Sequence, residues 1–291
     1  MRKILVALTA VALLASCGKN DENNAQGNGV APKKIIVRDA NNKLKETTEL
    51  TFANGKVVGV VKKDYDNNLL KTTEITTYSY EGNRLVGVKK EKTGSNDSQK
   101  TFFYENGKIV TMTEKEVGKN YSVTTKYTYE GDRLVKKVES KPITKRVNGM
   151  LEVGADCTEY QYTYKDNEVT KVKTEYKKDA NDVVVETNPN SETTIYTFLN
   201  GNLVKKQALG SVEEYKYDTK QNPERYSVVT PDEVFEVAYS KNNVVEETHK
   251  TLGKTTYEYI YNNNGYPTVK KKYEEEAGKV RELEEITEYQ Y

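Results

Sequence analysis

The sequence offers very little of the chemistry that usually makes a catalytic site. His249 is the only imidazole, and it follows Glu246 and Glu247 in a segment that reads as a strand. A nucleophile and its general base also need a third group that orients the base, and no G-x-S-x-G motif accompanies this histidine. We expect His249 to be an exposed strand residue, and we predict no catalytic residues and no enzymatic activity.

Cys157 is the only cysteine outside the first 17 residues, and it lies where a strand is predicted to begin. With no second cysteine at hand, an intrachain disulfide is not expected once Cys17 is modified as described below. We favour a buried or half-buried structural thiol over a nucleophile.

Acidic residues number 44, which is too many for their presence alone to indicate a site. Asp64, Asp66 and Asn68 alternate as calcium ligands do, but the segment lacks the glycine and the distal glutamate of a calcium loop. We expect a solvated hairpin end there, and we predict no metal and no cofactor. Two carboxylates suited to glycoside hydrolysis could lie almost anywhere among the acids, so an enzyme with an unrecognised carboxylate site stays open as an alternative.

Tyrosine is the one side chain present in unusual quantity, at 23 residues against 5 Phe and no Trp. On a strand, alternate residues share a face. Sugars and peptides can lie on such aromatic stripes, so these tyrosines are the candidate ligand-binding residues. The alternative, which we favour, is that the rings fill the interior of a barrel. The two stripes are Tyr160, Tyr162 and Tyr164, and Tyr257, Tyr259 and Tyr261.

The overall composition excludes several classes of protein. The 291 residues include 45 basic and 44 acidic side chains, so the formal net charge is only +1, and the mean hydropathy is −0.83. These values exclude a multi-spanning helical membrane protein. They also argue against nucleic acid as a partner, because that binding depends on an excess of basic residues.

Turn signals recur along the chain from Lys33 to Tyr291. Asn-Gly between alternating strands is a strong hairpin signal, because a type I′ turn requires positive φ at both central residues. A second set of Gly- and Asn-containing turns falls between the tight turns, as expected for the two ends of an up-and-down meander. The tight turns are Asn54-Gly55, Gly82-Asn83, Asn106-Gly107, Gly131-Asp132 and Asn200-Gly201.

The hairpins are self-similar, which indicates a repeat. Each unit has two aromatic residues one apart, a polar residue, a tight turn, another polar residue and then Leu-Val or Ile-Val. A two-residue turn at Gly131-Asp132 places Tyr129 opposite Leu134 and Thr128 opposite Val135, with Tyr127 and Val138 on one face. The same register predicts three further pairs, Tyr80 with Leu85, Tyr104 with Ile109 and Phe198 with Leu203.

Residues 33–291 therefore read as one all-β domain with no composition break. We predict an antiparallel up-and-down meander of about 20 strands in repeated hairpins, forming a strongly curved sheet or a closed barrel. The segments 145–156 and 179–191 are longer than a turn, so each is either a short extra hairpin or an extended loop.

The N-terminus resembles a bacterial lipoprotein signal. Basic residues precede an apolar run from Ile4 to Ala15, which is too short for a permanent membrane helix. Leu14-Ala15-Ser16-Cys17 is similar to a lipobox, which implies cleavage after residue 16 and acylation of Cys17. Residues 1–16 are then the signal peptide, and the acyl chains would anchor the protein to a membrane without a transmembrane segment.

Residues 17–32 form a polar segment with no apolar periodicity, and we expect a flexible tether after the lipidated cysteine. Lys19, Asp21 and Glu22 resemble the export tag that directs Bacteroidota lipoproteins to the outside of the outer membrane. A merely solvated linker is the alternative, so the protein is expected at the outer membrane facing either the surface or the periplasm.

Two resemblances concern the hairpin domain. The units Tyr78–Val88 and Tyr127–Lys137 resemble the YD repeats of the RHS family, which imply a curved shell built from successive hairpins. The layout of lipobox, polar tether and hairpin domain is similar to uncharacterised Bacteroidota lipoproteins that carry a domain of unknown function described as porin-like. Neither resemblance implies an activity.

We do not expect the strands to cross the membrane. Thr268, Lys270 and Lys272 would share one strand face, and a lysine at the bilayer midplane costs roughly 2–4 kcal/mol. The sequence thus predicts a non-catalytic, membrane-anchored envelope lipoprotein that acts as a binding or structural module. The alternative is a surface protein that binds a glycan or a peptide through its tyrosine stripes.

Overall fold

The computed structural model describes residues 31–147, 150–224, 230–250, 253–276 and 279–291. Within these ranges almost every segment is a strand or a turn. The strands are β1 Lys34–Asp39, β2 Leu44–Ala53, β3 Lys56–Asp66, β4 Leu69–Glu81, β5 Arg84–Lys92, β6 Ser98–Glu105, β7 Lys108–Glu116, β8 Val123–Glu130, β9 Arg133–Val147, β10 Met150–Lys165, β11 Glu168–Asp179, β12 Val184–Thr187, β13 Glu192–Leu199, β14 Asn202–Ala208, β15 Ser211–Gln221, β16 Asn242–His249, β17 Gly253–Tyr261, β18 Pro267–Glu275 and β19 Glu282–Gln290.

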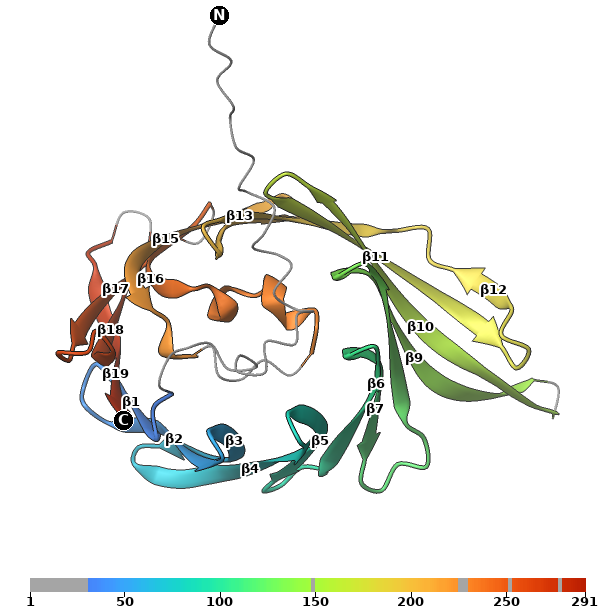
Figure 1. Ribbon diagram of the computed structural model, residues 1–291, viewed down its shortest axis with the longest axis horizontal. Helices are drawn as coiled ribbons and strands as arrows, with labels where there is room; N and C mark the ends of the chain where they lie inside the picture. The colour runs from blue at the N-terminus through green and yellow to red at the C-terminus, as the bar shows by residue number, and fades with distance from the viewer. Residues whose placement is uncertain (1–30, 148–149, 225–229, 251–252, 277–278) are drawn as a thin grey trace, which may run out of the picture.

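The strands form one antiparallel sheet that closes on itself, because β1 pairs with both β2 and β19. Strand β12 stands apart from this ring: it pairs with the end of β11 at Tyr176, while β13 pairs with the other half of β11. The result is an 18-stranded barrel with β12 as an appendage, seen as a ring in Figure 1. This confirms the predicted all-β meander, and of the two predicted forms, a strongly curved sheet or a closed barrel, the structure has the closed barrel.

The tight turns have the backbone that their sequences predict. Asn54 and Gly55 have φ of 51° and 74°, and Asn106 and Gly107 have 50° and 80°, as a type I′ turn requires. These turns gather at one end of the barrel, hereafter the tight-turn end. The alternate connections, such as those after β1, β3 and β5, lie at the opposite end, hereafter the far end.

A β-bulge follows the first two rungs of five of the hairpins, whereas the hairpin of β10 and β11 has none. Tyr129 pairs with Leu134 as predicted, but Thr128 pairs with Lys136 because Val135 is an extra residue. The predicted pairing of Thr128 with Val135 is therefore wrong, and Val138 faces away from Tyr127. The same shift occurs beside Phe52, Tyr80, Tyr104 and Phe198. A bulge bends its strand and increases the local twist, which favours a closed barrel.

The two segments predicted as extra hairpins or loops extend the sheet beyond the ring. Strands β9 and β10 continue past the barrel wall as a long ladder, with Gly154 opposite Ile143. The second segment contains β12, whose residues are all exposed. Both segments lie together at one side of the barrel in Figure 1.

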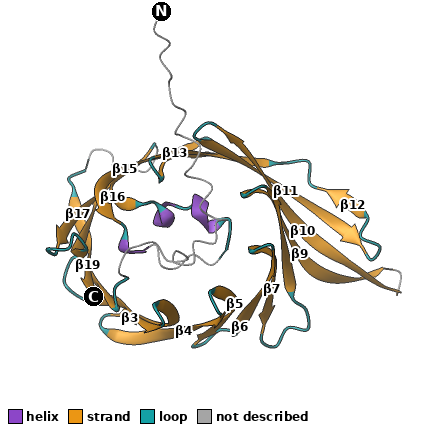
Figure 2. Ribbon diagram, in the orientation of Figure 1, coloured by secondary structure: helices purple, strands orange, loops and turns teal. Residues whose placement is uncertain are grey.

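The part of the connection between β15 and β16 that the structure describes lies inside the barrel. It contains two single-turn 3-10 helices, η3 Glu233–Phe235 and η4 Val237–Tyr239, which lie within the ring in Figure 2. The main apolar cluster joins Phe235 to buried residues of the surrounding wall, among them Phe102, Tyr162 and Tyr196. The core of the protein is thus the inner face of the barrel at its tight-turn end. No helix in the described ranges is long and apolar enough to cross a membrane.

Candidate functional site

The best-defined candidate site is the contact between the inner wall and the segment that enters it. We call the described parts of this connection, residues 222–224 and 230–241, the interior segment. The other connections at the tight-turn end are short turns. A connection as long as this one is therefore not needed to join the neighbouring antiparallel strands β15 and β16. It is the feature of the barrel interior that the sequence analysis missed, because Gln221-Asn222-Pro223 and Pro231-Asp232 have the residue types of ordinary turns.

An aromatic anchor holds the interior segment to the wall. Phe235 is only 3% exposed, and its ring centroid lies 5.2 Å from that of Tyr162 and 5.7 Å from that of Tyr196. Phe198 adds a tilted contact at 6.4 Å. Such aromatic pairs add about 0.5–1.5 kcal/mol each beyond the burial of apolar area.

Charged side chains of the wall meet carboxylates of the interior segment at two places. Lys137 Nζ lies 2.6 Å from Asp232 Oδ2, and Lys270 Nζ lies 2.8 Å from Glu224 Oε1. Tyr289 donates its hydroxyl proton to the same Glu224 oxygen at 2.7 Å. Desolvation opposes ionisation of Glu224, but Lys270 and Tyr289 outweigh it, so the pKa of Glu224 is lowered.

Lys137 and Lys171 both lie on the inner wall, but their pKa values are shifted in opposite directions. Burial favours the neutral amine in both, yet Asp232 and Glu139 raise the pKa of Lys137. The pKa of Lys171 is lowered instead, because burial outweighs the more distant carboxylates of Glu236 and Asp232. Lys171 Nζ lies over aromatic rings, 5.3 Å from the centroid of Tyr196 and 5.7 Å from that of Tyr160.

The repeated tyrosines next to the tight turns form a ladder around the wall. The hydroxyl of Tyr104 donates to the carbonyl of Leu85 at 2.8 Å, and that of Tyr164 donates to the carbonyl of Leu134 at 2.7 Å. A basic side chain from the preceding hairpin often covers the ring, as Arg84 covers Tyr104. Four further rungs run from Tyr80 to Val57, Tyr129 to Ile109, Tyr217 to Leu203 and Tyr259 to Val244.

The first candidate stripe, Tyr160, Tyr162 and Tyr164, faces the barrel interior. Tyr162 stacks on Phe235, Tyr164 belongs to the ladder, and Tyr160 lies under Lys137. Burial raises the pKa of Tyr160 and of Tyr162. The stripe is therefore part of the wall that holds the interior segment.

The second stripe, Tyr257, Tyr259 and Tyr261, also faces inward, and its hydroxyls have partners. Tyr257 donates to Glu247 Oε2 at 3.5 Å, and Tyr261 donates to Asp218 Oδ2. The rings of Tyr259 and Tyr261 stack with centroids 5.8 Å apart. This stripe stabilises the wall on the far side of the interior from Tyr162.

His249 ends β16 and is not the exposed residue that we predicted, since only 23% of its side chain is exposed. Its Nε2 lies 3.1 Å from Ser211 Oγ and 3.9 Å from Glu213 Oε1. A catalytic triad requires the acid on the other ring nitrogen, so this contact does not have that geometry. The arrangement suits a structural hydrogen bond between neighbouring strands.

Cys157 agrees with the prediction of a buried thiol, at 3% exposed, although it lies in the middle of β10 and not at a strand start. Its Sγ lies 3.5 Å from Ser140 Oγ on β9. Within the described ranges, no group of three or more His, Cys, Asp or Glu side chains could hold a metal ion.

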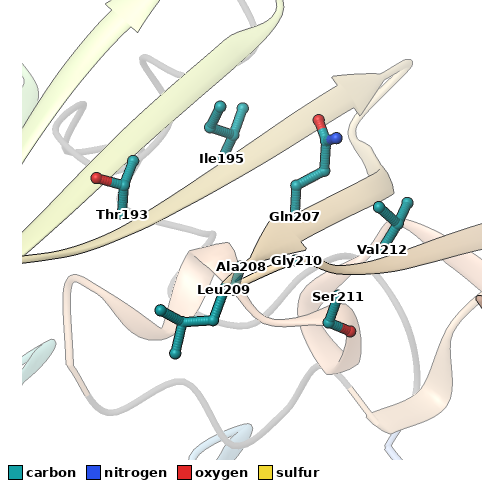
Figure 3. Close-up of a pocket in the computed structure, with 8 residues that line it drawn as sticks. All are labelled: Thr193, Ile195, Gln207, Ala208, Leu209, Gly210, Ser211 and Val212. Carbon is teal, nitrogen blue, oxygen red and sulfur yellow. The ribbon is translucent and has the colours of Figure 1, made fainter. Parts of the chain in front are cut away.

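A shallow hollow lies on the outer face at the far end, near the turn between β14 and β15. Ile195, Gln207 and Val212 point into it, whereas Ser211 points to the other side of the sheet (Figure 3). The contact between Ser211 and His249 therefore lies on the opposite face from the hollow. Cys17, Lys19, Asp21 and Glu22 lie outside the described residues.

Among known proteins, this chain is similar to solved structures but matches no family by sequence. No family model matches the chain, and no curated protein matches it either. A porin-like protein from Bacteroides uniformis is similar over 89% of this chain and 96% of its own, with 12% identity and a TM-score of 0.42. A porin-like protein from Bacteroides vulgatus covers 90% of this chain and 99% of its own, with 13% identity and a TM-score of 0.25.

A chain of the Photorhabdus luminescens Tc holotoxin pore is also similar, with 12% identity and a TM-score of 0.31. The similarity covers 82% of this chain but only 14% of that much longer one. The description of this protein as a closed barrel rests on its own strand pairings.

Proposed function

We propose that this chain is a non-catalytic cell-envelope lipoprotein, held at the outer membrane by acyl chains on Cys17. Its barrel stands outside the bilayer and acts as a binding or structural module. The single observation that carries this proposal is the polar outer wall. A barrel that crosses a membrane needs an apolar outward band about 25 Å tall.

The outer wall is polar at the middle of its strands as well as at its ends. Since Tyr78 and Thr76 face inward on β4, the alternate residues face outward, and they are Thr73, Ile75, Thr77, Ser79 and Glu81. On the opposite part of the wall, Glu246 Oε1 lies 2.8 Å from Lys216 Nζ at the centre of β15 and β16. A lysine at the midplane of a bilayer would cost roughly 2–4 kcal/mol. Lys270 and Lys272, in contrast, face the barrel interior, so they do not bear on contact with a membrane.

The position of the first described strand supports a definite orientation. Lys33 bonds to Gln290 and Leu50, beside the tight turn at Asn54-Gly55, so the chain enters and leaves the barrel at the tight-turn end. Fifteen residues lie between Cys17 and Lys33, and a tether with the flexibility that its composition predicts would span on the order of 20 Å. An anchor at Cys17 would thus keep the tight-turn end towards the membrane and the far end away from it.

The test is membrane fractionation of the full-length precursor with Cys17→Ala and, as a matched control, Cys157→Ala. We expect wild type and Cys157→Ala in the membrane fraction and the detergent phase, and Cys17→Ala in the soluble fraction. If Cys17→Ala stayed in the membrane after carbonate extraction, the barrel itself would be embedded and the proposal would be wrong.

A further inference from the structure

The central part of the interior segment, from Thr230 to Tyr239, is held to the wall by side chains, in the manner of a bound peptide. Between Thr230 and Tyr239, the backbone hydrogen bonds are local, for example from Phe235 N to Asp232 O and from Glu236 N to Glu233 O. Glu233 also accepts hydrogen bonds from Thr230 N and from the hydroxyl of Tyr239. This stretch is folded by its own contacts, and side chains such as Phe235 and Asp232 attach it to the wall.

The segment leaves polar groups of the interior unsatisfied. The hydroxyl of Tyr127 and Oδ1 of Asp232 are buried without a hydrogen-bond partner among the described residues, and Tyr127 is only 4% exposed. Leaving a buried polar group unpaired costs about 1–3 kcal/mol. The wall thus offers a hydrogen-bond donor that the interior segment does not use.

A second feature of this part of the inner wall is a lysine that has no carboxylate partner among the described residues. Lys171 is half-buried on the inner wall, and no carboxylate of the described residues lies within 4.0 Å of its ammonium group, although Lys137 nearby has two such partners. A half-buried cation is stabilised by an anionic partner, because burial weakens its hydration. The inner wall could therefore bind a further carboxylate in addition to that of Asp232.

From this contact we infer that the inner wall around Tyr127, Lys137, Tyr162 and Lys171 is a binding surface for an acidic peptide with an aromatic anchor. The chain's own residues 230–240 occupy it as an imperfect ligand. A peptide segment with a central aromatic residue flanked by carboxylates displaces them, places its ring between Tyr162 and Tyr196, and pairs with the two lysines. This inference rests on the proposed role as a binding module and names its ligand.

The experiment uses a fluorescein-labelled synthetic peptide with the sequence of residues 230–240 and full-length protein purified in detergent. Binding is measured by fluorescence anisotropy for wild type and for Phe235→Ala, in which the chain's own anchor is lost. Because apparent affinity scales with the fraction of molecules whose surface is vacant, we expect Phe235→Ala to bind the peptide at least about tenfold more tightly than wild type. Asp232→Asn is a milder change that keeps the ring of Phe235. We expect its affinity for the peptide to lie between those of wild type and Phe235→Ala.

Two controls identify the surface. The peptide with alanine in place of its phenylalanine should not bind, and Lys171→Met in the Phe235→Ala background should weaken binding several-fold. Phe103→Ala removes a phenylalanine that is 52% exposed on the outer wall, and it should leave the affinity at the wild-type value. Circular dichroism and urea unfolding confirm that each variant is folded, and Asp232→Asn carries the test if Phe235→Ala does not fold.

Equal binding of the peptide by all folded variants would overturn the inference, and so would equal binding of the peptide without its aromatic ring. Absence of binding to folded Phe235→Ala and Asp232→Asn would do the same. None of these outcomes affects the fractionation of Cys17→Ala, so failure of this inference and failure of the proposed function are distinguishable.

Discussion

The two ends of the barrel interior are built from different chemistry. At the tight-turn end, the inner wall is aromatic and aliphatic, the tyrosine hydroxyls bond to neighbouring carbonyls, and the interior segment fills the space. At the far end, the same strands carry lysines and glutamates on their inner face, and these form pairs such as Lys62 with Glu46 and Lys90 with Glu74. The stabilising burial is therefore concentrated at one end.

This difference indicates where each end derives its stability. Burial of an aromatic side chain contributes several kcal/mol, whereas a solvent-accessible ion pair contributes about 0–1 kcal/mol. Lys90 is 49% exposed in its pair with Glu74, so water screens much of the attraction. We expect the tight-turn end to be the last part of the barrel to open, and four substitutions test this difference between the two ends.

The largest effect should come from two adjacent phenylalanines on β6. Phe102 is 4% exposed on the inner wall, whereas Phe103 is 52% exposed on the outer wall. Phe102→Ala should lower the free energy of unfolding by about 3–5 kcal/mol, and Phe103→Ala by about 0.5 kcal/mol or less. Urea unfolding followed by circular dichroism measures both, and similar losses in the two variants would mean that the inner wall is not the core.

The tyrosine ladder is the next feature to test. Tyr164→Phe removes the hydroxyl that donates to Leu134 O at 2.7 Å, so we expect a loss of about 1 kcal/mol in the free energy of unfolding. Tyr273→Phe is the control, because its hydroxyl reaches the exposed carboxylate of Glu258. A loss no larger than that of the control would show that the ladder adds nothing to stability.

A pH-dependent effect is expected from Glu247, which faces the interior towards the far end. Burial and the neighbouring carboxylate of Glu213 raise its pKa above the ordinary value of 4.5. Its protonated form is thus favoured in the folded state, and the stability gained below pH 4.5 is lost as the pH rises through the higher folded pKa.

Glu247→Gln should therefore increase stability at pH 7 by no more than about 1 kcal/mol and leave it nearly unchanged at pH 4. Thermal melts from pH 4 to pH 8 measure this difference, and Glu214→Gln on the outer face is the control. A decrease in stability at pH 7 would show that the charged form of Glu247 is stabilised by its partners.

The smallest effect should come from the ion pairs of the far end. Lys90→Ala should change the free energy of unfolding by less than about 0.5 kcal/mol, because the pair with Glu74 is solvated. Raising the salt concentration should reduce even that difference. If urea unfolding showed a change above about 1 kcal/mol in the free energy of unfolding, the far end would contribute to stability as strongly as the tight-turn end.

Much of the fold was predictable because its signals are local. Asn54-Gly55 and Asn106-Gly107 require positive φ, and alternating strands around such turns leave few arrangements other than a meander. The pairing of Tyr129 with Leu134 followed from the turn alone. The bulge at Val135 could not be predicted in this way. The curvature of the whole sheet accommodates the extra residue, and no residue type marks its position in the sequence.

The candidate site was predictable in part. Alternation placed Tyr160, Tyr162 and Tyr164 on one face, and the preference for a barrel interior agrees with their position. The partner of Tyr162 was not predictable, since Phe235 lies 73 residues away along the chain and belongs to a segment with no strong pattern of its own. The contact of His249 with Ser211 was missed for the same reason, because they lie on different strands.

The sequence by itself determined the strand content, the two alternating sets of turns and the shared face of each tyrosine pair, because these depend on backbone preferences and on the two-residue period of a strand. Only the tertiary structure decided that the sheet closes through β1 and β19, and that Phe235 and Asp232 enter the interior to meet Tyr162 and Lys137. Those contacts join residues far apart in the chain, and their energy exists only once the barrel has brought them together.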